Sequence, residues 1–165
     1  MRPLILSGGP AVGKSTCGRL LAESRARAAF IDVDDIRQLV VSGAATLWSG
    51  SEGESQHILA ARNTAALARN LLAAGFDVVA ADVLSQDSLL AYRDDLPECL
   101  VVHLAISFDH ALRRAATRPV YLTDDEFELL HRLTETPPRA DVILEVDGLT
   151  IEQQTRAIAD VWRAS

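Results

Sequence analysis

Lysine is nearly absent from this chain: of its 16 basic residues only Lys14 is a lysine, and all the others are arginines. Cysteine is also scarce, since Cys17 and Cys99 are the only two and their spacing matches no metal-binding pair. A disulfide framework is therefore not expected, and a reducing cytoplasm is the predicted compartment. Aromatic residues make up only 5% of the chain, so alanine, leucine and valine must supply most of the packing.

Long hydrophobic runs are missing as well. No stretch approaches the roughly 20 apolar residues of a membrane-spanning helix, and residues 4–6 are too short an apolar run for a signal peptide. A net charge of -7 argues against broad binding of nucleic acid, although a local arginine-lined groove stays open. The length of 165 residues, without repeats or linkers, predicts one domain over residues 1–165.

The hydrophobic pattern predicts five strands that alternate with helices. The strands are expected within residues 3–6, 28–36, 76–83, 99–106 and 140–146. Helices are expected at residues 15–27, 35–42, 57–74, 86–96 and 109–117 and at the C-terminal end, with a loop at 43–56 and a short lid at about 118–135. Near-continuous apolar strands of this kind form a parallel sheet that helices cover on both faces. The predicted fold is therefore a three-layer α/β fold.

The segment "LSGGPAVGKST" explains the single lysine. Gly8, four further residues and Gly13-Lys14-Ser15 have the spacing of a P-loop, and the segment lies between the first strand and the first helix. Backbone N–H groups of such a loop surround phosphate, and the compact lysine ammonium fits the cradle better than the planar fork of arginine. A chance glycine-rich turn would not explain the position of the lysine. The predicted nucleotide-binding residues are Gly8, Gly9, Ala11, Val12, Gly13, Lys14, Ser15 and Thr16, with the Ser15 hydroxyl on a magnesium ion.

Carboxylates gather after the second strand, where burying them without a function is costly. Asp34 is predicted to be the catalytic carboxylate that accepts a proton from the attacking hydroxyl. Asp35 is predicted to cap the following helix, and Asp32 is a candidate for the metal or for a supporting role. Arg37 is interpreted as a substrate-binding residue, with a solvated helix arginine as the alternative.

Further candidates follow the third and fourth strands. Asp82 ends the third strand as "VVAAD" and is predicted to hold the metal through water, beside the substrate. Arg118 stands where the lid begins and is predicted to stabilise the migrating phosphoryl group. One of Arg113 and Arg114 is predicted to stack on the nucleotide base; a solvated helix face is the alternative for this arginine group.

In these features the chain resembles the small P-loop kinases, among them shikimate, gluconate and nucleoside-monophosphate kinases. It is most similar to chloramphenicol phosphotransferase-like kinases, in "VDDI" and "AGFDVVAADV". The resemblance implies that Lys14 holds phosphates, Asp34 is the base and Arg118 is the lid arginine. It also places the turn of Asp147 and Gly148 beside adenine. The lid is short and acidic, and an arginine set for a substrate phosphate is not evident, which disfavours a phosphorylated acceptor.

Two other functions stay open. "DVDDIRQLV" also resembles polynucleotide 5′-hydroxyl kinases, in which Arg37 would bind the phosphate of the acceptor; the acidic charge and the few aromatics count against this. A basic groove beside Arg37 would favour that alternative, and a closed apolar pocket would favour a small molecule. A nucleotide-dependent ATPase or switch is the third hypothesis. A standard GTPase is excluded, because its base-reading motif needs a second lysine.

The sequence therefore predicts a kinase that uses ATP and Mg²⁺ to phosphorylate a hydroxyl of a small molecule, with neither a membrane nor nucleic acid as partner. The family likeness suggests an antibiotic or another metabolite as the acceptor. The loop at 43–56 is predicted to form the substrate wall through Trp48, for which a packing role is the alternative.

The first prediction concerns the lysine itself. Lys14→Ala and Lys14→Arg should both abolish phosphoryl transfer while the circular dichroism spectrum stays native, because the side chain serves a ligand rather than the core. Turnover and the spectrum are measured on the same preparations. Normal turnover of Lys14→Arg would contradict the argument from the shape of the side chain.

Overall fold

The structure, a computed structural model, describes residues 1–116 and 122–165. It contains a five-stranded sheet in the order β2-β3-β1-β4-β5, and every neighbouring pair is parallel. The strands are β1 (Leu4–Gly8), β2 (Ala28–Asp32), β3 (Asp77–Ala81), β4 (Leu100–Ala105) and β5 (Val142–Glu145). Each lies within or close to a stretch that the hydrophobic pattern marked as a strand.

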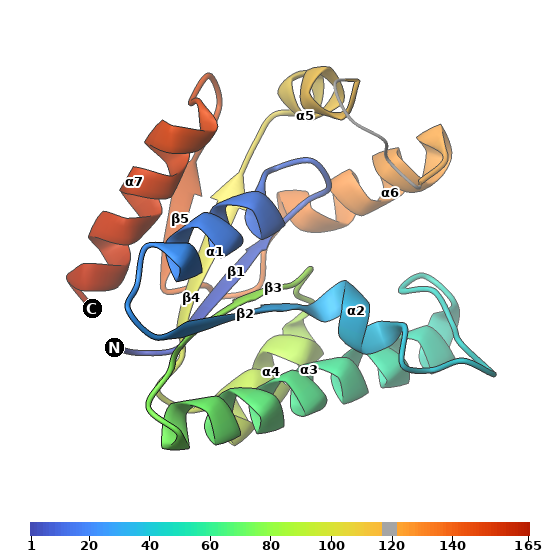
Figure 1. Ribbon diagram of the computed structural model, residues 1–165. Coiled ribbons are helices and arrows are strands. Elements are labelled where there is room, and N and C mark those ends of the chain that lie inside the picture. Colours follow the sequence, from blue (N-terminus) through green and yellow to red (C-terminus); the bar gives the residue numbers. More distant parts are fainter. Residues whose placement is uncertain (117–121) are drawn as a thin grey trace.

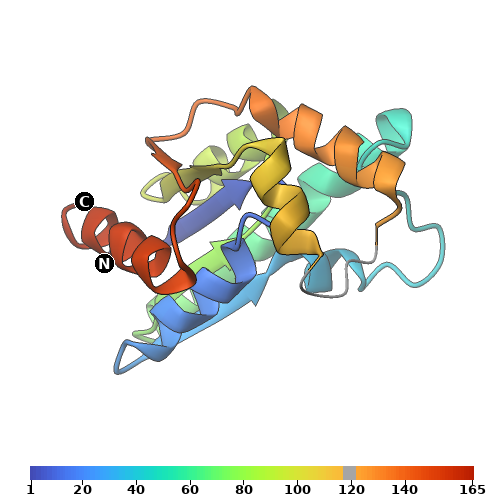
Figure 2. The ribbon, with the colours of Figure 1, turned by 90° about the horizontal axis from the view of Figure 1, so that it is seen from above.

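Helices cover both faces of this sheet, which confirms the predicted three layers. Helices α1 (Lys14–Glu23) and α7 (Ile151–Arg163) lie on one face, and α3 (Gly50–Ala73) and α4 (Gln86–Asp95) lie on the other (Figure 1). The remaining helices stand at the end of the sheet where the strands finish. These are α2 (Val33–Arg37), α5 (Phe108–Ala115) and α6 (Asp124–Glu135), and Figure 2 shows α5 and α6 beside the loop that follows β1.

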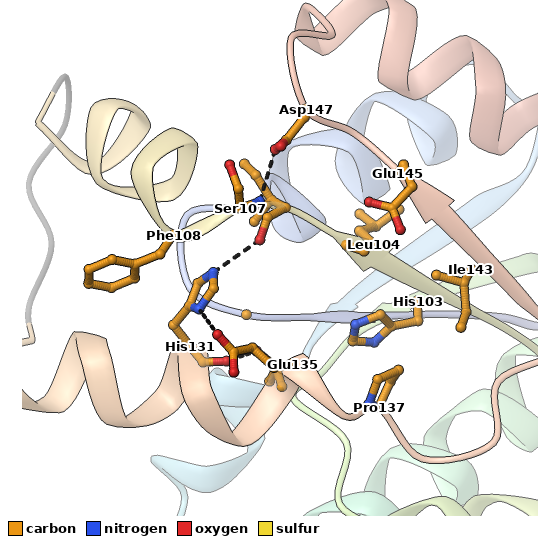
Figure 3. Close-up of a pocket in the computed structure, with 14 residues that line it drawn as sticks. His103, Leu104, Ser107, Phe108, His131, Glu135, Pro137, Ile143, Glu145 and Asp147 are labelled. Atoms are coloured by element: carbon orange, nitrogen blue, oxygen red, sulfur yellow. Dashed lines mark hydrogen bonds and ion pairs between the residues drawn. The ribbon is translucent and has the colours of Figure 1, made fainter.

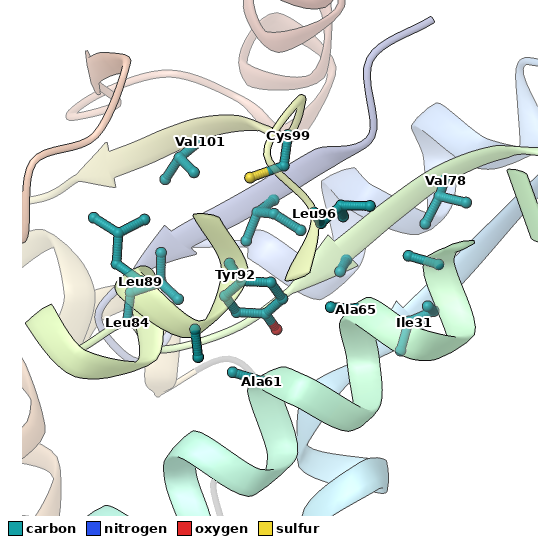
Figure 4. Packing of buried hydrophobic residues seen from close by; sticks show 14 residues of the cluster. Ile31, Ala61, Ala65, Val78, Leu84, Leu89, Tyr92, Leu96, Cys99 and Val101 are labelled. Atoms are coloured by element: carbon teal, nitrogen blue, oxygen red, sulfur yellow. The ribbon is translucent and has the colours of Figure 1, made fainter. Parts of the chain in front are cut away.

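The core is divided by the sheet, as alternating strand residues require. Leu4 and Leu6 of β1 pack toward α1 and α7, whereas Ile5 packs toward α3 and α4. On the second side the ring of Tyr92 is fully buried among small and aliphatic side chains, including Ala61 and Ala65 of α3 (Figure 4). Alanines on α3 thus leave room for one of the few aromatic residues, whose hydroxyl donates a hydrogen bond to Asp82 just after β3.

The segment predicted as a loop at 43–56 is only partly a loop, because α3 begins at Gly50. The polar residues that suggested a loop instead tie the helix to the chain before it. Gln56 accepts a hydrogen bond from the amide of Ala45 at 2.9 Å and donates one to the carbonyl of Gly43 at 2.8 Å. The close approach requires Gly53, since a Cβ there would lie 2.1 Å from the carbonyl oxygen of Thr46.

The described part of the predicted lid contains α6. Thr123 and Glu126 form a capping box at its start, and three acidic residues in its first turn suit the positive end of a helix. Phe127 is buried, and its ring centroid lies 6.2 Å from that of Phe108 in α5. The acidic stretch is therefore a helix with one apolar face. Arg118 lies outside the described residues.

In residues 1–116 and 122–165, no helix combines the length and the apolar character that crossing a membrane requires.

Two neighbouring leucines of α1 test the account of the core. Leu21→Ala should lower the free energy of unfolding by about 2–5 kcal/mol, because Leu21 is 2% exposed and its removal leaves a cavity. Leu20→Ala is the matched control; at 40% exposure it should cost less than about 1 kcal/mol. Urea denaturation of both variants checks this, and equal losses would contradict the packing of α1.

Candidate active site

The loop after β1 has the shape of a phosphate cradle. Gly13 has φ +100° just before α1, and Gly8 has φ +142° where a Cβ would lie 2.5 Å from the carbonyl oxygen of Leu104. Both positions require glycine. The Lys14 ammonium donates hydrogen bonds to the carbonyls of Gly8 and Gly9 at 2.8 Å each, so the side chain curls back over the loop. Ser15 follows in the first turn of α1.

A clamp of two side chains holds this loop from behind. Arg114 of α5 donates to the carbonyl of Val12 at 2.9 Å and to those of Val146 and Leu149 at 3.2 and 2.8 Å. Gln154 of α7 donates to the same Val12 carbonyl at 2.8 Å and accepts from Arg114 at 3.1 Å. Arg114 therefore joins the P-loop to the turn after β5. Stacking of Arg114 on the nucleotide base stays a prediction. The neighbouring Arg113 is exposed.

The electrostatics at Lys14 favour a ligand with negative charge. Burial lowers the pKa of the Lys14 ammonium to about 8, although the carboxylates of Asp34, Asp82 and Asp32 act in the opposite direction. The lysine is thus still charged at neutral pH, and a phosphate would stabilise that charge.

The acidic cluster after β2 divides its roles differently from the prediction. Asp32, not Asp35, is the N-cap of α2, because its carboxylate accepts a hydrogen bond from the amide of Asp34 at 3.3 Å. The prediction that Asp35 caps the helix was wrong. Strand β2 ends at Asp32, so α2 begins at Val33, earlier than the hydrophobic pattern suggested. Asp34 lies in the first turn with its side chain 74% exposed toward the cavity described below.

Arg37 joins two of the predicted site residues. One end of its guanidinium bonds Asp34 at 2.5 Å, and the other end bonds Asp82. Burial alone would lower the pKa of Arg37, but the two carboxylates outweigh it and raise the pKa above its usual value. Arg37 is therefore a charged bridge between the ends of β2 and β3 rather than a solvated helix arginine.

Asp82 is completely buried at the end of β3. Besides Arg37 it accepts hydrogen bonds from the amide of Val83 at 2.8 Å and from the hydroxyl of Tyr92 at 3.0 Å. Burial alone would raise its pKa, but nearby His57 and Arg37 and the hydroxyl of Tyr92 hold the pKa below the ordinary value. The group is an ionised carboxylate held by donors from three elements.

These groups surround a cavity of about 700 Å³, which we call the acceptor cavity. Its polar lining includes Lys14 and Ser15 of the P-loop and the carboxylates of Asp32 and Asp34; Asp82 also belongs to the wall, although its side chain has no exposed surface. Its apolar lining comes from the segment before α3, from the end of β3 and from α6. Residues of the cavity that the sequence placed in the site are Ala11, Lys14, Ser15, Asp34, Arg37, Trp48 and Asp82, together with the metal candidate Asp32. In the described residues, no group of three or more His, Cys, Asp or Glu side chains is arranged to hold a metal ion.

The turn after β5 does not line the acceptor cavity and borders a different one. Asp147 accepts a hydrogen bond from the amide of Ser107 at 2.9 Å, and this bond, more than any other contact, lowers the pKa of the carboxyl (Figure 3). Gly148 follows in the turn with φ +71°. A separate cavity of about 500 Å³ lies between Asp147, β4 and α6. The expectation that Asp147 and Gly148 lie beside adenine stays a prediction.

Three buried polar residues of the site escaped the sequence analysis. Tyr92 and His57 both approach Asp82, at 3.0 and 3.8 Å respectively. Neither carried a signal, because each is a single polar residue in an ordinary helical pattern. Gln154 did carry one: it lies three residues after Ile151 and four before Ile158, on the apolar face of α7, where a fully buried amide needs partners.

A P-loop between a strand and a helix, with carboxylates at the ends of the two strands beside it, defines the protein as a P-loop nucleotide-binding protein of the kinase type. More particularly, a model of the shikimate kinase family, described as "Shikimate kinase", matches residues 10–163, and the chain belongs to that family. Family membership makes it an ATP-dependent kinase that acts on a hydroxyl group. No curated protein sequence matches the chain.

Solved structures share the fold over nearly the whole chain. A sugar kinase from Janibacter sp. HTCC2649, unliganded, is 16% identical with a TM-score of 0.74, covering 99% of this chain and 95% of that one. A gluconokinase from Sinorhizobium meliloti 1021 is 20% identical with a TM-score of 0.70, covering 99% and 93%. The shikimate kinase from Acinetobacter baumannii, in complex with shikimate, is 23% identical with a TM-score of 0.64, covering 99% and 94%.

The lowered pKa of Lys14 leads to a pH prediction. A nucleotide needs the charged ammonium, and the empty site loses that charge as the pH rises through about 8. Affinity for a non-hydrolysable ATP analogue should therefore be constant below that pH and be about tenfold weaker at about pH 9 than at about pH 7. Isothermal titration calorimetry measures it. Lys14→Gln should bind weakly and show no such slope; a wild-type affinity independent of pH would contradict the assignment.

Proposed function

We propose that this protein transfers the terminal phosphoryl group of magnesium-bound ATP to a hydroxyl of a small molecule, with Asp34 as the general base. The observation that carries the proposal is the shared cavity: Lys14, Ser15 and Asp34 line one space of about 700 Å³ at the carboxyl ends of the strands. A hydroxyl beside Asp34 would face a phosphate held over the P-loop. This is the arrangement that in-line phosphoryl transfer needs.

The nucleotide would occupy the P-loop through Gly8 to Thr16, with Lys14 on its phosphates. For Mg²⁺, the Ser15 hydroxyl is a suitable direct ligand. The oxygens of Asp82 already accept hydrogen bonds from three donors, which fits contact through water better than direct coordination. Mg²⁺ usually keeps several of its waters in such sites. When bound, the ion would neutralise charge on the phosphates.

Asp34 is suited to a base because it is held in place and yet accessible. Arg37 pins one carboxylate oxygen at 2.5 Å, and the side chain is 74% exposed toward the cavity. The carboxylate would hydrogen-bond the acceptor hydroxyl, orient its oxygen toward the phosphate and take its proton. Arg37 would thus act on the acceptor through Asp34, in addition to any direct contact.

The acceptor would lie against Trp48, which lines the cavity from the segment before α3. The cavity is lined by apolar side chains and by carboxylates. This lining supports a small molecule as the acceptor, rather than the phosphate-rich end of a polynucleotide. An antibiotic or other metabolite is the proposed class, from the resemblance to chloramphenicol phosphotransferase-like kinases. Arg118 as the arginine on the migrating phosphoryl group, and the lid at 118–135, stay predictions.

A screen with a paired variant tests the proposal. Wild-type protein is incubated with ATP, Mg²⁺ and a library of hydroxyl compounds, and the products are detected by mass spectrometry. Asp34→Asn should lower turnover of any hit by roughly a hundredfold or more, the range of a general base, with the affinity for ATP nearly unchanged. Asp35→Asn is the matched control and should be mild. A crippled Asp35→Asn with a normal Asp34→Asn would overturn the assignment of the base.

A further inference from the structure

The strongest unexplained feature of the molecule is a second cavity of about 570 Å³ that adjoins the acceptor cavity. We call it the apolar annex. The two cavities share the side chains of Leu47, Trp48, Val83 and Leu130. The two cavities therefore lie against the same four side chains, and an acceptor that extends past the ring of Trp48 would reach the annex.

Aliphatic side chains form much of the annex wall, which also includes the polar residues Ser51, Glu54, His57, Ser85 and Thr134. Beyond the shared wall it is lined by Leu84 at the end of β3 and by Leu129 and Leu133 of α6. Leu133 is 56% exposed, although it sits on a helix whose other large apolar residues are mostly buried. Apolar surface left open beside a substrate cavity is suited to an apolar ligand.

One polar atom in this lining lacks a partner. His57 is 6% exposed, and its Nε2 makes no hydrogen bond to another described residue. The nearest carboxylate oxygen, on Asp82, is 3.8 Å away, which is too long for a hydrogen bond. This buried nitrogen lies beside the Asp82 carboxylate, whose pKa His57 helps to lower, so His57 closes one end of the annex without presenting an exposed polar atom to it.

The charges of the acceptor cavity disfavour an anionic ligand. Among the described lining residues, the cations are Lys14, which lies on the P-loop, and Arg37. Both ends of the Arg37 guanidinium are already paired, with Asp34 and Asp82. With Lys14 engaged by nucleotide, the carboxylates outnumber the cations, and a carboxylate or sulfate on the acceptor would meet repulsion.

We infer that the acceptor is an uncharged alcohol with an apolar body: its hydroxyl lies at Asp34, and its body passes Trp48 into the annex. The inference rests on the proposed function and narrows its acceptor. It separates this chain from any kinase whose acceptor is recognised through a carboxylate.

Pairs of acceptors that differ only in charge test whether the site prefers an uncharged acceptor. Alcohols with aromatic or aliphatic bodies are offered twice, as the free carboxylate and as the methyl ester, and kcat/KM is measured for each pair. The ester should be preferred by about tenfold or more, since only the acid brings a charge among carboxylates. Equal or reversed preference would overturn the inference while leaving the kinase activity proven.

Dye binding tests the annex without any enzymatic turnover. The existence of an apolar binding site can therefore be decided even if the screen of hydroxyl compounds finds no acceptor. The uncharged dye N-phenyl-1-naphthylamine should bind in the presence of the ATP analogue, and its sulfonated relative 1-anilinonaphthalene-8-sulfonate should bind about tenfold more weakly or worse. Leu133→Lys places a charge at the annex and should weaken binding of the uncharged dye about tenfold.

Leu67→Lys is the matched control, because Leu67 is an exposed leucine of α3 that lines neither cavity. It should change neither dye binding nor kcat/KM for the preferred ester, whereas Leu133→Lys should raise KM for that ester with little change in kcat. Circular dichroism confirms that both variants are folded. Stronger binding of the sulfonate, or equal effects of the two substitutions, would overturn the inference.

Discussion

The acceptor side of this molecule depends on the burial of one carboxylate. Asp82 has no exposed surface, so its charge must be balanced inside the protein, and Arg37, the amide of Val83 and the hydroxyl of Tyr92 do so. Because these donors come from α2, from the end of β3 and from α4, the same contacts hold three elements together. The same arginine also positions Asp34, because the second terminal nitrogen of the Arg37 guanidinium donates a hydrogen bond to the Asp34 carboxylate. The position of the proposed base is thus set by a buried ion pair.

The two halves of the site are built on different physical principles. The nucleotide half is mostly backbone: carbonyls of the P-loop accept hydrogen bonds from Lys14, Arg114 and Gln154, and backbone amides are the groups with which such a loop surrounds phosphate. The acceptor half is made of side chains from segments far apart in sequence. A backbone cradle suits a ligand that every member of the family shares, whereas side chains can change the acceptor without disturbing the fold.

Sequence reasoning succeeded where the signal was local. The P-loop spacing, the apolar strands and the acidic strand ends led to the sheet, its two covered faces and several residues of the acceptor cavity, although not to the leucines of its wall. It failed where a helix boundary had to be placed within a run of acidic residues, because the cap of α2 is Asp32, three residues before the predicted Asp35. It also failed where a partner comes from across the fold: nothing near His57 or Tyr92 in the chain shows that each approaches Asp82. The start of α3 was missed because its polar residues bond backwards to the loop.

The clamp at Arg114 limits what mutagenesis can reveal about the nucleotide base. A single guanidinium binds carbonyls of the P-loop, of Val146 and of Leu149, so removing it frees three stretches of backbone at once. An Arg114 variant that loses ATP affinity would be equally compatible with a lost stacking partner and with a relaxed loop. The informative comparison is between nucleotides: lost stacking weakens ATP more than inorganic triphosphate, whereas a relaxed loop weakens both alike.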